Sequence, residues 1–343
     1  MTHPQAATAD SAHPFDQLTP HAILAALEDV GLFCDGRLFQ LNSFENRVFQ
    51  AYLEGGDAIV VKFYRPGRWT DAQIEEEHAF ALELAAAEVP VVAPLPLRHG
   101  TTLAHTQVGG QPFRLAVYPR MSGAAPDLER PDTLAWLGRF IGRLHAVGAR
   151  KPFIHRTQLT PATFGRRAVQ KILSIEALPL DMVESWRTSV HHALDAVEAA
   201  FDGVGPCAQR LHGDCHLGNI LWRDAGPHIV DLDDACTGPA IQDLWMFLSG
   251  DPDAVAEQIR VLLEGYRCFA TFDPRELALI EPLRTLRMIH HSAWLAERWS
   301  DPAFPIAFPW FGTAAYWTEQ VTILKEQLPA MASAAHRATL SSA

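Results

Sequence analysis

A polar stretch between two apolar runs has the residue types and spacing that phosphoryl transfer needs. Asp214 precedes Asn219 by five positions, and Asp231 follows the apolar run 227–230. Transfer from a nucleotide uses a carboxylate to accept the proton of the attacking hydroxyl, and an amide oxygen and a second carboxylate to bind Mg²⁺. This spacing is that of a kinase catalytic loop. We therefore predict Asp214 and Asp231 as catalytic residues, with Asp214 as general base and Asn219 and Asp231 as metal ligands.

Asp233 is a candidate ligand of a second metal ion. It lies two residues after Asp231, and residues two apart in an extended segment point to the same side. The alternative for all these residues is a polar turn in which Asp and Asn make only local hydrogen bonds. Two correctly spaced carboxylates, the Asn and the flanking apolar runs together favour the kinase-type site.

Lys62 is the predicted phosphate-pairing lysine. It lies in the apolar run 58–64, after a hairpin signal at residues 54–57. A kinase places such a lysine in a strand of this kind. An edge-strand lysine that faces water is the alternative.

A capping box at residues 70–73 predicts a helix that extends to about Ala87. Three consecutive glutamates lie in its first turns, and a solvated helix face would account for two of them. We predict that Glu77 pairs with Lys62, and Glu76 is the near rival.

The turn and the junction that should hold the nucleotide carry weaker signals. No Gly-x-Gly-x-x-Gly precedes the lysine; the corresponding hairpin contains Asn42 and Ser43, which are candidates to contact phosphate oxygens but also common turn formers. Further on, the strand pattern breaks after Tyr118. We place the lobe junction at residues 117–123, where backbone groups of Val117 to Met121 are expected to bind the adenine edge; an ordinary loop is the alternative.

The remaining pattern predicts an α+β, bilobal, protein-kinase-like fold with a β-rich N-lobe and a mainly helical C-lobe. The expected domains are a disordered tail, the nucleotide-binding N-lobe, the hinge and the catalytic, substrate-binding C-lobe, at residues 1–14, 15–116, 117–123 and 124–343. Strands are expected at 37–42, 47–53, 58–64, 101–108 and 112–118, and helices at 20–31, 70–87, from 131, and at 181–201, 241–248, 254–269, 274–299 and 314–328.

Two further polar residues of the C-lobe have expected structural roles. Asp243 starts the apolar segment 241–248, where it either braces the catalytic loop by accepting backbone hydrogen bonds or only serves a helix N-terminus. His145 continues an apolar stripe and is expected to be a hydrogen-bonded core residue. The aromatic residues of 294–317 are expected to be mostly core.

Composition limits the function further. The net charge of -12 argues against nucleic acid or an anionic membrane as the main partner. No apolar run reaches spanning length, and the first residues lack an apolar signal core. The five cysteines are scattered, without metal-site spacing, which favours a reducing, cytoplasmic location.

With these residues placed, residues 18–328 resemble the stress response kinase A family (the SrkA/YihE/RdoA-type kinases), in the aminoglycoside phosphotransferase-like branch of the protein-kinase fold. The resemblance is carried by Leu41-Asn42-Ser43, Val60-Val61-Lys62-Phe63-Tyr64-Arg65-Pro66, His212-Gly213-Asp214-Cys215-His216, Gly218-Asn219-Ile220-Leu221-Trp222-Arg223-Asp224, Val230-Asp231-Leu232-Asp233-Asp234-Ala235, Gly238-Pro239-Ala240, Gln242-Asp243-Leu244-Trp245 and Trp299-Ser300-Asp301-Pro302-Ala303-Phe304-Pro305.

The resemblance implies a set of roles and partners. Asp214 would be the proton acceptor, Asn219 and Asp231 the magnesium ligands, and Ser43 a contact to ATP, so that ATP and Mg²⁺ are the expected cofactors. It further implies phosphorylation of protein serine and threonine, a part in stress protection, and a cytoplasmic monomer that binds neither nucleic acid nor membrane.

Departures from the wider protein-kinase pattern keep alternatives open. Gly213 stands where many protein kinases have arginine, and the short segment from Asp231 to Asp243 leaves no room for a long activation loop. We hypothesise that phosphorylation of this segment does not switch the enzyme. A small-molecule kinase acting on an amino alcohol, sugar or aminoglycoside is the rival within enzymes, and a pseudokinase or binding module is the rival outside them. Cys215 and Cys236 flank the catalytic acids; they are either redox-sensitive or small packing residues.

Overall fold

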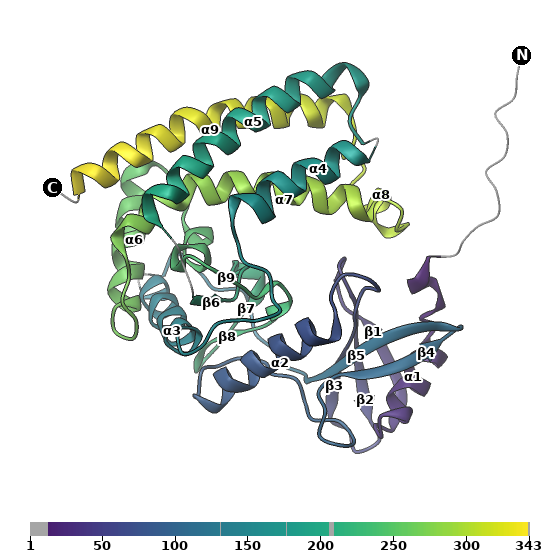
Figure 1. Ribbon diagram of the computed structural model, residues 1–343. Helices are drawn as coiled ribbons and strands as arrows, with labels where there is room; N and C mark the ends of the chain where they lie inside the picture. Colours follow the sequence, from purple (N-terminus) through teal and green to yellow (C-terminus); the bar gives the residue numbers. More distant parts are fainter. Residues whose placement is uncertain (1–12, 131, 176, 206–208, 342–343) are drawn as a thin grey trace, which may run out of the picture. The chain divides into compact units, whose positions relative to one another are not determined.

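The computed structural model describes residues 13–130, 132–175, 177–205 and 209–341, and the backbone alone for 334–341. The chain forms two compact units, each described here by itself (Figure 1). The sheet unit consists of the chain up to Trp69, Leu95–Arg120 and Ser300–Ile306; the helical unit consists of Thr70–Pro94, Met121–Trp299 and the chain from Ala307. The predicted α+β kinase-like fold is confirmed, whereas the predicted lobe boundaries remain predictions.

A five-stranded antiparallel sheet forms the sheet unit, in the order β1-β2-β3-β5-β4. Its strands are β1 (Cys34–Gln40), β2 (Arg47–Leu53), β3 (Ala58–Phe63), β4 (Ala104–Val108) and β5 (Gln111–Pro119). The register pairs Lys62 on β3 with Val48 on β2 and with Ala116 on β5. Lys62 therefore lies on a central strand and not on an edge strand.

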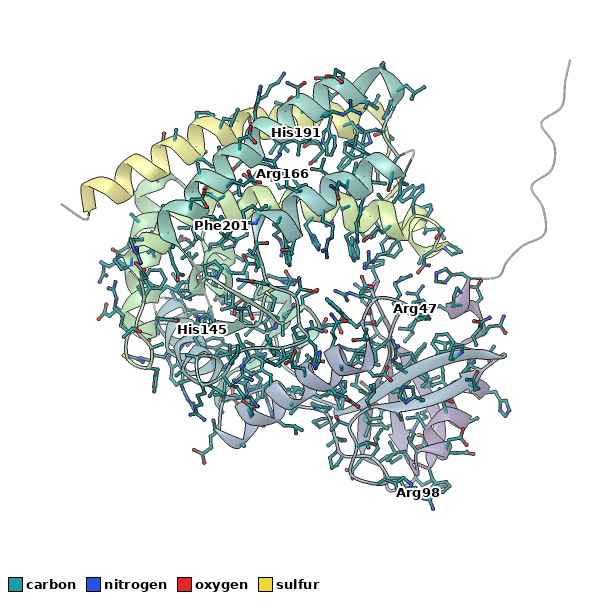
Figure 2. The ribbon with its side chains drawn as sticks, viewed as in Figure 1. Arg47, Arg98, His145, Arg166, His191 and Phe201 are labelled. Carbon is teal, nitrogen blue, oxygen red and sulfur yellow. The ribbon has the colours of Figure 1, made fainter. Side chains whose placement is uncertain are left out.

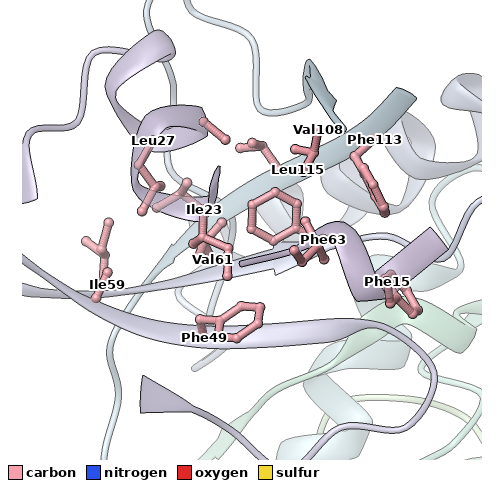
Figure 3. Packing of buried hydrophobic residues seen from close by; sticks show 14 residues of the cluster. Phe15, Ile23, Leu27, Phe49, Ile59, Val61, Phe63, Val108, Phe113 and Leu115 are labelled. Carbon is pink, nitrogen blue, oxygen red and sulfur yellow. The ribbon is translucent and has the colours of Figure 1, made fainter. Parts of the chain in front are cut away.

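One face of this sheet packs against the N-terminal segment. Helix α1 (Pro20–Asp29) begins after its N-cap residue Thr19 and contributes Ile23 and Leu27. The short η1 (Pro14–Gln17) contributes Phe15. These side chains pack against the apolar face of the strands, as Figure 3 shows. Burial of this apolar cluster is the main source of stability of the unit.

The helical unit is built from pairs of packed helices and short catalytic strands. The pairs are α3 with α6, α4 with α7 and α5 with α9, and α5 and α9 lie side by side in Figure 1. The helices are α2 (Asp71–Ala86), α3 (Thr133–Gly148), α4 (Arg167–Ser174), α5 (Val183–Val204), α6 (Pro252–Tyr266), α7 (Ile280–Arg298) and α9 (Ala314–Ser341), and α8 (Ala303–Ala307) links the units.

Glycines allow α3 and α6 to approach closely. A Cβ at Gly138 on α3 would lie 2.0 Å from the Leu262 carbonyl oxygen, and one at Gly265 on α6 would lie 2.3 Å from that of Ala135. No side chain fits at either position. This close contact fixes α3, which carries the buried His145 that contacts Asp243 (Figure 2 labels His145).

The structure also corrects the sequence predictions. Residues 241–248 do not form an apolar helix; they form two 3₁₀ turns, η6 (Ala240–Asp243) and η7 (Trp245–Phe247). Hydrogen bonds from distant residues hold this segment in turns despite its helical sequence pattern. For example, Glu276 accepts from the Ile241 amide at 3.0 Å. Helix α4, preceded by the single π turn η2 (Pro161–Arg166), was not predicted.

Two further expectations concern the chain ends and the membrane. The predicted tail, residues 1–14, lies outside the described residues except for His13 and Pro14, and His13 caps η1. Among the helices in the described part of the chain, none has the length and hydropathy needed to cross a membrane.

Candidate active site

The catalytic strands bring three predicted site residues together in the helical unit. Strand β7 (Ile220–Arg223) pairs with β8 (Gly226–Ile229), and the Val230 amide donates to the Asn219 carbonyl at 3.0 Å. Asp231 therefore comes directly after Val230, the residue whose amide is bonded to Asn219. The Asn219 Nδ2 donates to the Asp214 carbonyl oxygen at 3.0 Å. The hairpin and this hydrogen bond place the backbones of Asp214, Asn219 and Asp231 around one point.

Asp231 adopts a backbone conformation that is uncommon outside glycine. Its φ of 61° and ψ of 64° lie in the left-handed region, which Asp and Asn visit more readily than most residues. Such residues concentrate at functional sites, where the surrounding structure holds them. This observation supports a functional role for Asp231.

The expectation of an extended segment from Asp231 to Asp233 is wrong. After the left-handed Asp231 the chain turns into η5 (Leu232–Asp234), a 3₁₀ turn. The alternation that would put Asp233 beside Asp231 therefore does not apply. The Asp233 side chain is buried, and its role as a metal ligand stays a prediction.

Asp243 braces the catalytic loop, the first of the two roles considered for it. Its Oδ2 accepts from the His212 amide at 2.7 Å, and its Oδ1 accepts from the Gly213 amide at 2.8 Å. The buried His145 lies 3.0 Å from Oδ2 through Nε2, and its Nδ1 lies 2.9 Å from the Tyr266 hydroxyl. With Tyr266 donating to Nδ1, the proton of His145 lies on Nε2 and points to Asp243. His145 is thus the hydrogen-bonded core histidine that was predicted.

His212 and Gly213 fit this brace closely. The Asp214 amide donates to His212 Nδ1 at 3.2 Å, so His212 carries its proton on Nε2 and donates to the Val230 carbonyl at 3.0 Å. Gly213 has a φ of +88°, and a Cβ there would lie 2.2 Å from the Asp234 carbonyl oxygen. Both conditions exclude larger residues, which explains why no arginine stands at this position.

The Asp214 carboxylate is paired with two basic side chains. Arg287 on α7 donates to its Oδ1, and His216 Nε2 lies 3.5 Å from its Oδ2. The Gly218 amide donates to His216 Nδ1 at 2.9 Å, which puts the His216 proton on Nε2, toward Asp214. Burial opposes ionisation, but His216 and Arg287 outweigh it and hold the pKa of Asp214 well below its usual range. The carboxylate is therefore kept ionised.

The turn that carries Asp231 is supported from helix α2. Arg156 donates to the Asp233 carbonyl at 2.5 Å through Nη2 and to the Ala235 carbonyl at 2.8 Å through Nε. Glu76 in turn accepts from the backbone amides of residues 154–156, at 2.5 to 2.8 Å. Glu76 thus has a clear role inside the helical unit. Glu77, its neighbour and the predicted partner of Lys62, is buried.

The sheet unit brings a second set of predicted residues together. The Lys62 Nζ lies 5.6 Å from the ring centroids of both Tyr64 and Tyr118, whose hydroxyls are 3.1 Å apart. Ser43 lies in the turn between β1 and β2, and its Oγ donates to the Asn46 carbonyl at 3.2 Å. Met121 and Glu77 belong to the helical unit. The pairing of Lys62 with Glu77 and the nucleotide contacts of Ser43, Tyr118 and Met121 remain predictions.

The donor set of the catalytic hairpin fits a hard divalent cation. Carboxylate and amide oxygens are the ligands that Mg²⁺ prefers. Because the Asn219 Nδ2 is bonded to the Asp214 carbonyl, its Oδ1 is the atom available for a metal. Asp231 follows at the strand end, in its left-handed conformation. Within the described residues no group of three or more His, Cys, Asp or Glu could by itself hold a metal ion.

A small pocket lies in the helical unit next to Arg287. It has a volume of about 260 Å³ and is lined by Met288, His291, Trp310, Tyr316, Glu319 and Gln320. His291 lies one helical turn beyond Arg287 on the same face of α7. Burial lowers the pKa of His291, as does Arg287, while Asp214 acts in the opposite direction. His291, which lines the pocket, is therefore close enough to Arg287 and Asp214 to interact with their charges.

Several supporting residues were not predicted from the sequence. Arg287 and Arg156 carry no local motif, because each acts on a segment more than 70 positions away. Glu76 was considered only as a partner of Lys62. The signal for His212 and His216 was present in the His-Gly-Asp-Cys-His run, but the tautomers that make them useful follow only from the contacts.

Comparison with known proteins places this site in a family. The phosphotransferase enzyme family (APH) matches residues 39–280, a span that contains the catalytic hairpin, Lys62 and Asp243. The chain therefore belongs to the phosphotransferase enzyme family, and within it to the stress response kinase A group. The enzyme class is a kinase.

Curated relatives cover almost the whole chain. The chain is 43% identical over 318 residues to the serine/threonine protein kinase RdoA of Salmonella typhimurium, covering 93% of this chain and 95% of the relative. It is 42% identical to stress response kinase A of Escherichia coli strain K12 over the same shares. The family resemblance seen in the sequence is thereby confirmed.

Solved structures with low identity share the fold. An amicoumacin kinase in complex with AMP-PNP and Ca²⁺ has a TM-score of 0.73 at 17% identity, covering 91% of this chain and 95% of that one. A microcompartment-associated aminopropanol kinase has a TM-score of 0.69 at 19% identity, covering 91% and 98%. These similarities support the kinase-like fold.

Proposed function

We propose that this protein is an ATP-dependent serine/threonine protein kinase that uses Mg²⁺ and takes Asp214 as its general base. The observation that carries the proposal is the full-length similarity to a relative named as a serine/threonine protein kinase, together with the grouping of Asp214, Asn219 and Asp231. A cytoplasmic location and a monomeric state belong to the same proposal.

The residues of the helical unit have separable tasks in this reaction. Asp214 accepts the proton of the substrate hydroxyl, and the brace from Asp243 keeps the loop in position while it does so. Arg287 and His216 keep Asp214 ionised and turned toward them. Since a carboxylate oxygen that accepts from Arg287 is partly occupied, an incoming hydroxyl competes with Arg287 or binds at the remaining lone pairs.

The metal and the nucleotide have candidate residues on both units. Asn219 and Asp231 would hold the metal ion, which when bound neutralises the negative charge on the transferred phosphoryl group. Lys62, Ser43 and Tyr118 on the sheet unit would bind the nucleotide. The AMP-PNP and Ca²⁺ bound by the amicoumacin kinase of similar fold support the use of a nucleotide and a divalent ion.

The decisive test is the variant Asp214→Asn, measured with labelled ATP and casein-type acceptors. Loss of a positioned general base lowers turnover by about 10²–10⁴-fold. A matched control is Asp195→Asn, because Asp195 forms an exposed ion pair with Arg166 on the surface of the helical unit. Equal turnover in the wild type and Asp214→Asn would exclude Asp214 as the base.

A small-molecule kinase is the second candidate, and the pocket beside Arg287 favours it. Its lining combines the rings of Trp310 and Tyr316 with the carboxylate of Glu319, a combination that attracts an organic cation. The Tyr316 hydroxyl bonds Ser292 at 2.7 Å, which fixes that ring. The short segment from Asp231 to Asp243 suits this candidate as well.

The two candidates separate in one experiment. Purified protein receives labelled ATP with casein-type proteins in one arm and a panel of amino alcohols, sugars and aminoglycosides in the other. Label in serine or threonine of protein supports the first candidate. Label found only in small molecules, and lost in Glu319→Gln, supports the second and overturns the first.

A further inference from the structure

The turn between β1 and β2 (residues 41–46), which we call the β1–β2 turn, exposes its carbonyl groups to two arginines. Arg65 donates through Nη2 to the Phe44 carbonyl at 2.9 Å and through Nε to the Glu45 carbonyl at 2.8 Å. Arg47 donates through Nη1 to the carbonyls of Phe44 and Asn46, at 3.3 and 3.4 Å. Three consecutive carbonyls of the turn are thus held by guanidinium groups. Figure 2 labels Arg47 in the sheet unit.

The Asp301 carboxylate contacts both arginines, and Glu45 Oε1 also lies 3.3 Å from Arg65 Nε. The Asp301 side chain is 1% exposed; it accepts from Arg65 Nη2 at 2.7 Å and from Arg47 Nη2 at 3.0 Å. Asp301 belongs to the segment Ser300–Ile306, which joins the sheet unit from a position more than 230 residues further along the chain. A third donor, the Ala303 amide, binds Asp301 at 3.1 Å and closes the segment around the carboxylate.

Aromatic rings seal this cluster. The Arg47 and Arg65 guanidinium carbons lie 4.3 and 5.0 Å from the Phe15 ring centroid. Phe304, which is fully buried, packs edge-on against Phe44 with ring centroids 6.2 Å apart. A charge pair removed from water in this way is sensitive to the loss of one partner, because the other charge stays buried. Burial alone would raise the pKa of Asp301, but the hydrogen bond from Arg65 and the other contacts lower it below its usual value.

We propose that Asp301 is a positioning residue for nucleotide phosphates: it fixes Arg47 and Arg65, and these fix the β1–β2 turn that presents Ser43. The inference rests on the proposed function in one respect, that the turn contacts a nucleoside triphosphate. With three carbonyls held by arginine and the Ser43 hydroxyl donating to the Asn46 carbonyl, we expect the backbone amides of Asn42 and Ser43 to be the donors that face phosphate oxygens. The turn does without glycines because side chains supply the rigidity.

The test measures nucleotide binding directly, with AMP-PNP plus Mg²⁺ and with adenosine as separate probes, by calorimetry on the full chain. In Asp301→Asn the Kd for AMP-PNP is expected to rise about tenfold, since contacts to charged phosphates are lost. The Kd for adenosine is expected to stay within about twofold, because adenosine has no phosphates for the turn to contact. If Asp301 were needed only for folding, the substitution would weaken binding of both probes to the same extent and would lower the Tm.

Two further variants make the result specific. Asp35→Asn removes an exposed ion pair with Arg37 in the same unit, at 2.7 Å, and should leave both affinities unchanged. Arg47→Gln removes one of the two arginines and leaves Arg65 with Asp301; it should raise the Kd for AMP-PNP about threefold while the Kd for adenosine stays within about twofold. In the double variant Asp301→Asn, Ser43→Ala the losses should be less than additive if Asp301 acts through the turn.

The outcomes distinguish the inference from the proposed function. Wild-type protein that fails to bind AMP-PNP would overturn the proposed function itself. Wild-type protein that binds AMP-PNP, with Asp301→Asn and Arg47→Gln binding it equally well, would overturn the positioning role alone. Parallel loss of adenosine and AMP-PNP binding in Arg47→Gln would also overturn it.

Discussion

The β1–β2 turn and the catalytic loop at His212–Asp214 are fixed by side chains of opposite charge. In the turn, arginines donate to backbone carbonyls, and Asp301 neutralises them. In the loop, the Asp243 carboxylate accepts from the amides of His212 and Gly213. Each device satisfies buried backbone groups that no helix or sheet satisfies. The charge of the side chain matches the backbone groups that it holds, which are carbonyls in the turn and amides in the loop.

The difference has a consequence for how each region can fail. The turn depends on strong bases and on a carboxylate whose pKa is lowered, so its charges do not change near neutral pH. The catalytic loop depends on Asp243, on its partner His145 and on the nearby Glu276, which accepts a hydrogen bond from the Ile241 amide. We therefore expect the two regions to respond differently to substitution, to pH and to oxidation.

The largest effect is expected from Asp243→Ala. Three donors, the amides of His212 and Gly213 and Nε2 of His145, lose their acceptor, which should lower the free energy of unfolding by about 5 kcal/mol. Urea denaturation measures this change. In Asp243→Asn, one oxygen remains and about half of the loss should be recovered.

The variant Asp243→Asn also tests whether the catalytic loop and the β1–β2 turn act independently. Asp243→Asn should lower kcat about 100-fold while the Kd for AMP-PNP changes less than about twofold, because the loop that carries the base is displaced and the β1–β2 turn is not. Asp301→Asn should show the opposite pattern. If both variants changed the same parameter, the two devices would not be independent.

The second largest effect is a pH dependence of the free energy of unfolding that comes from Glu276. Burial and the nearby Asp273 raise the pKa of Glu276 to about 7, although the Ile241 amide bonds it. Its ordinary value is 4.5, so between these values the folded protein holds a proton that the unfolded chain releases. Stability from this group is therefore complete below pH 4.5 and is lost as pH rises through about 7, by up to about 3 kcal/mol.

Unfolding in urea at pH 5 and pH 8 tests this sign. Wild-type stability should fall between these pH values by more than that of Glu276→Gln, whose amide stays neutral. Glu257→Gln is the control, because Glu257 lies on the exposed face of α6 in a pair with Arg260. A variant that keeps the full pH dependence of the wild type would show that Glu276 is not the titrating group.

The smallest effect is expected from peroxide. Cys215 and Cys236 are buried, and burial raises the pKa of both thiols. A thiol of this kind contains little thiolate and reacts slowly. Activity should stay within about twofold after mild peroxide treatment, while mass spectrometry finds oxidation at the exposed Cys268. Oxidised Cys215 with matching loss of activity would instead support a redox switch.

Much of the fold follows from local sequence signals. The capping box at Thr70 and Gln73 starts α2 as predicted, and β2 has the predicted bounds of Arg47 to Leu53. Such features depend on neighbouring residues, so a single sequence is sufficient to find them. The brace by Asp243 was one of two roles that the sequence allowed, and only coordinates could choose between them.

The remaining features depend on residues far apart in the chain. The left-handed Asp231 and the turn after it result from the supports around them, including Arg156, and so the extended reading of 231–233 was wrong. Asp301 was noticed only as part of a family motif, because its two arginines lie at the other end of the sequence. Helix α4 was missed although Thr160 and Thr163 form a capping box at its π turn.

The return of Ser300–Ile306 to the sheet unit bears on synthesis. When the ribosome has released residue 120, every strand of the sheet has been made, but the acid that binds Arg47 and Arg65 has not. At about 5–20 residues per second, roughly 10–40 s pass before residue 301 follows. During that interval Arg47 and Arg65 lack the Asp301 carboxylate, and Glu45, whose Oε1 lies 3.3 Å from Arg65 Nε, is an acid of this cluster that has already been made. A fragment that ends before residue 300 would lack the Asp301 carboxylate altogether.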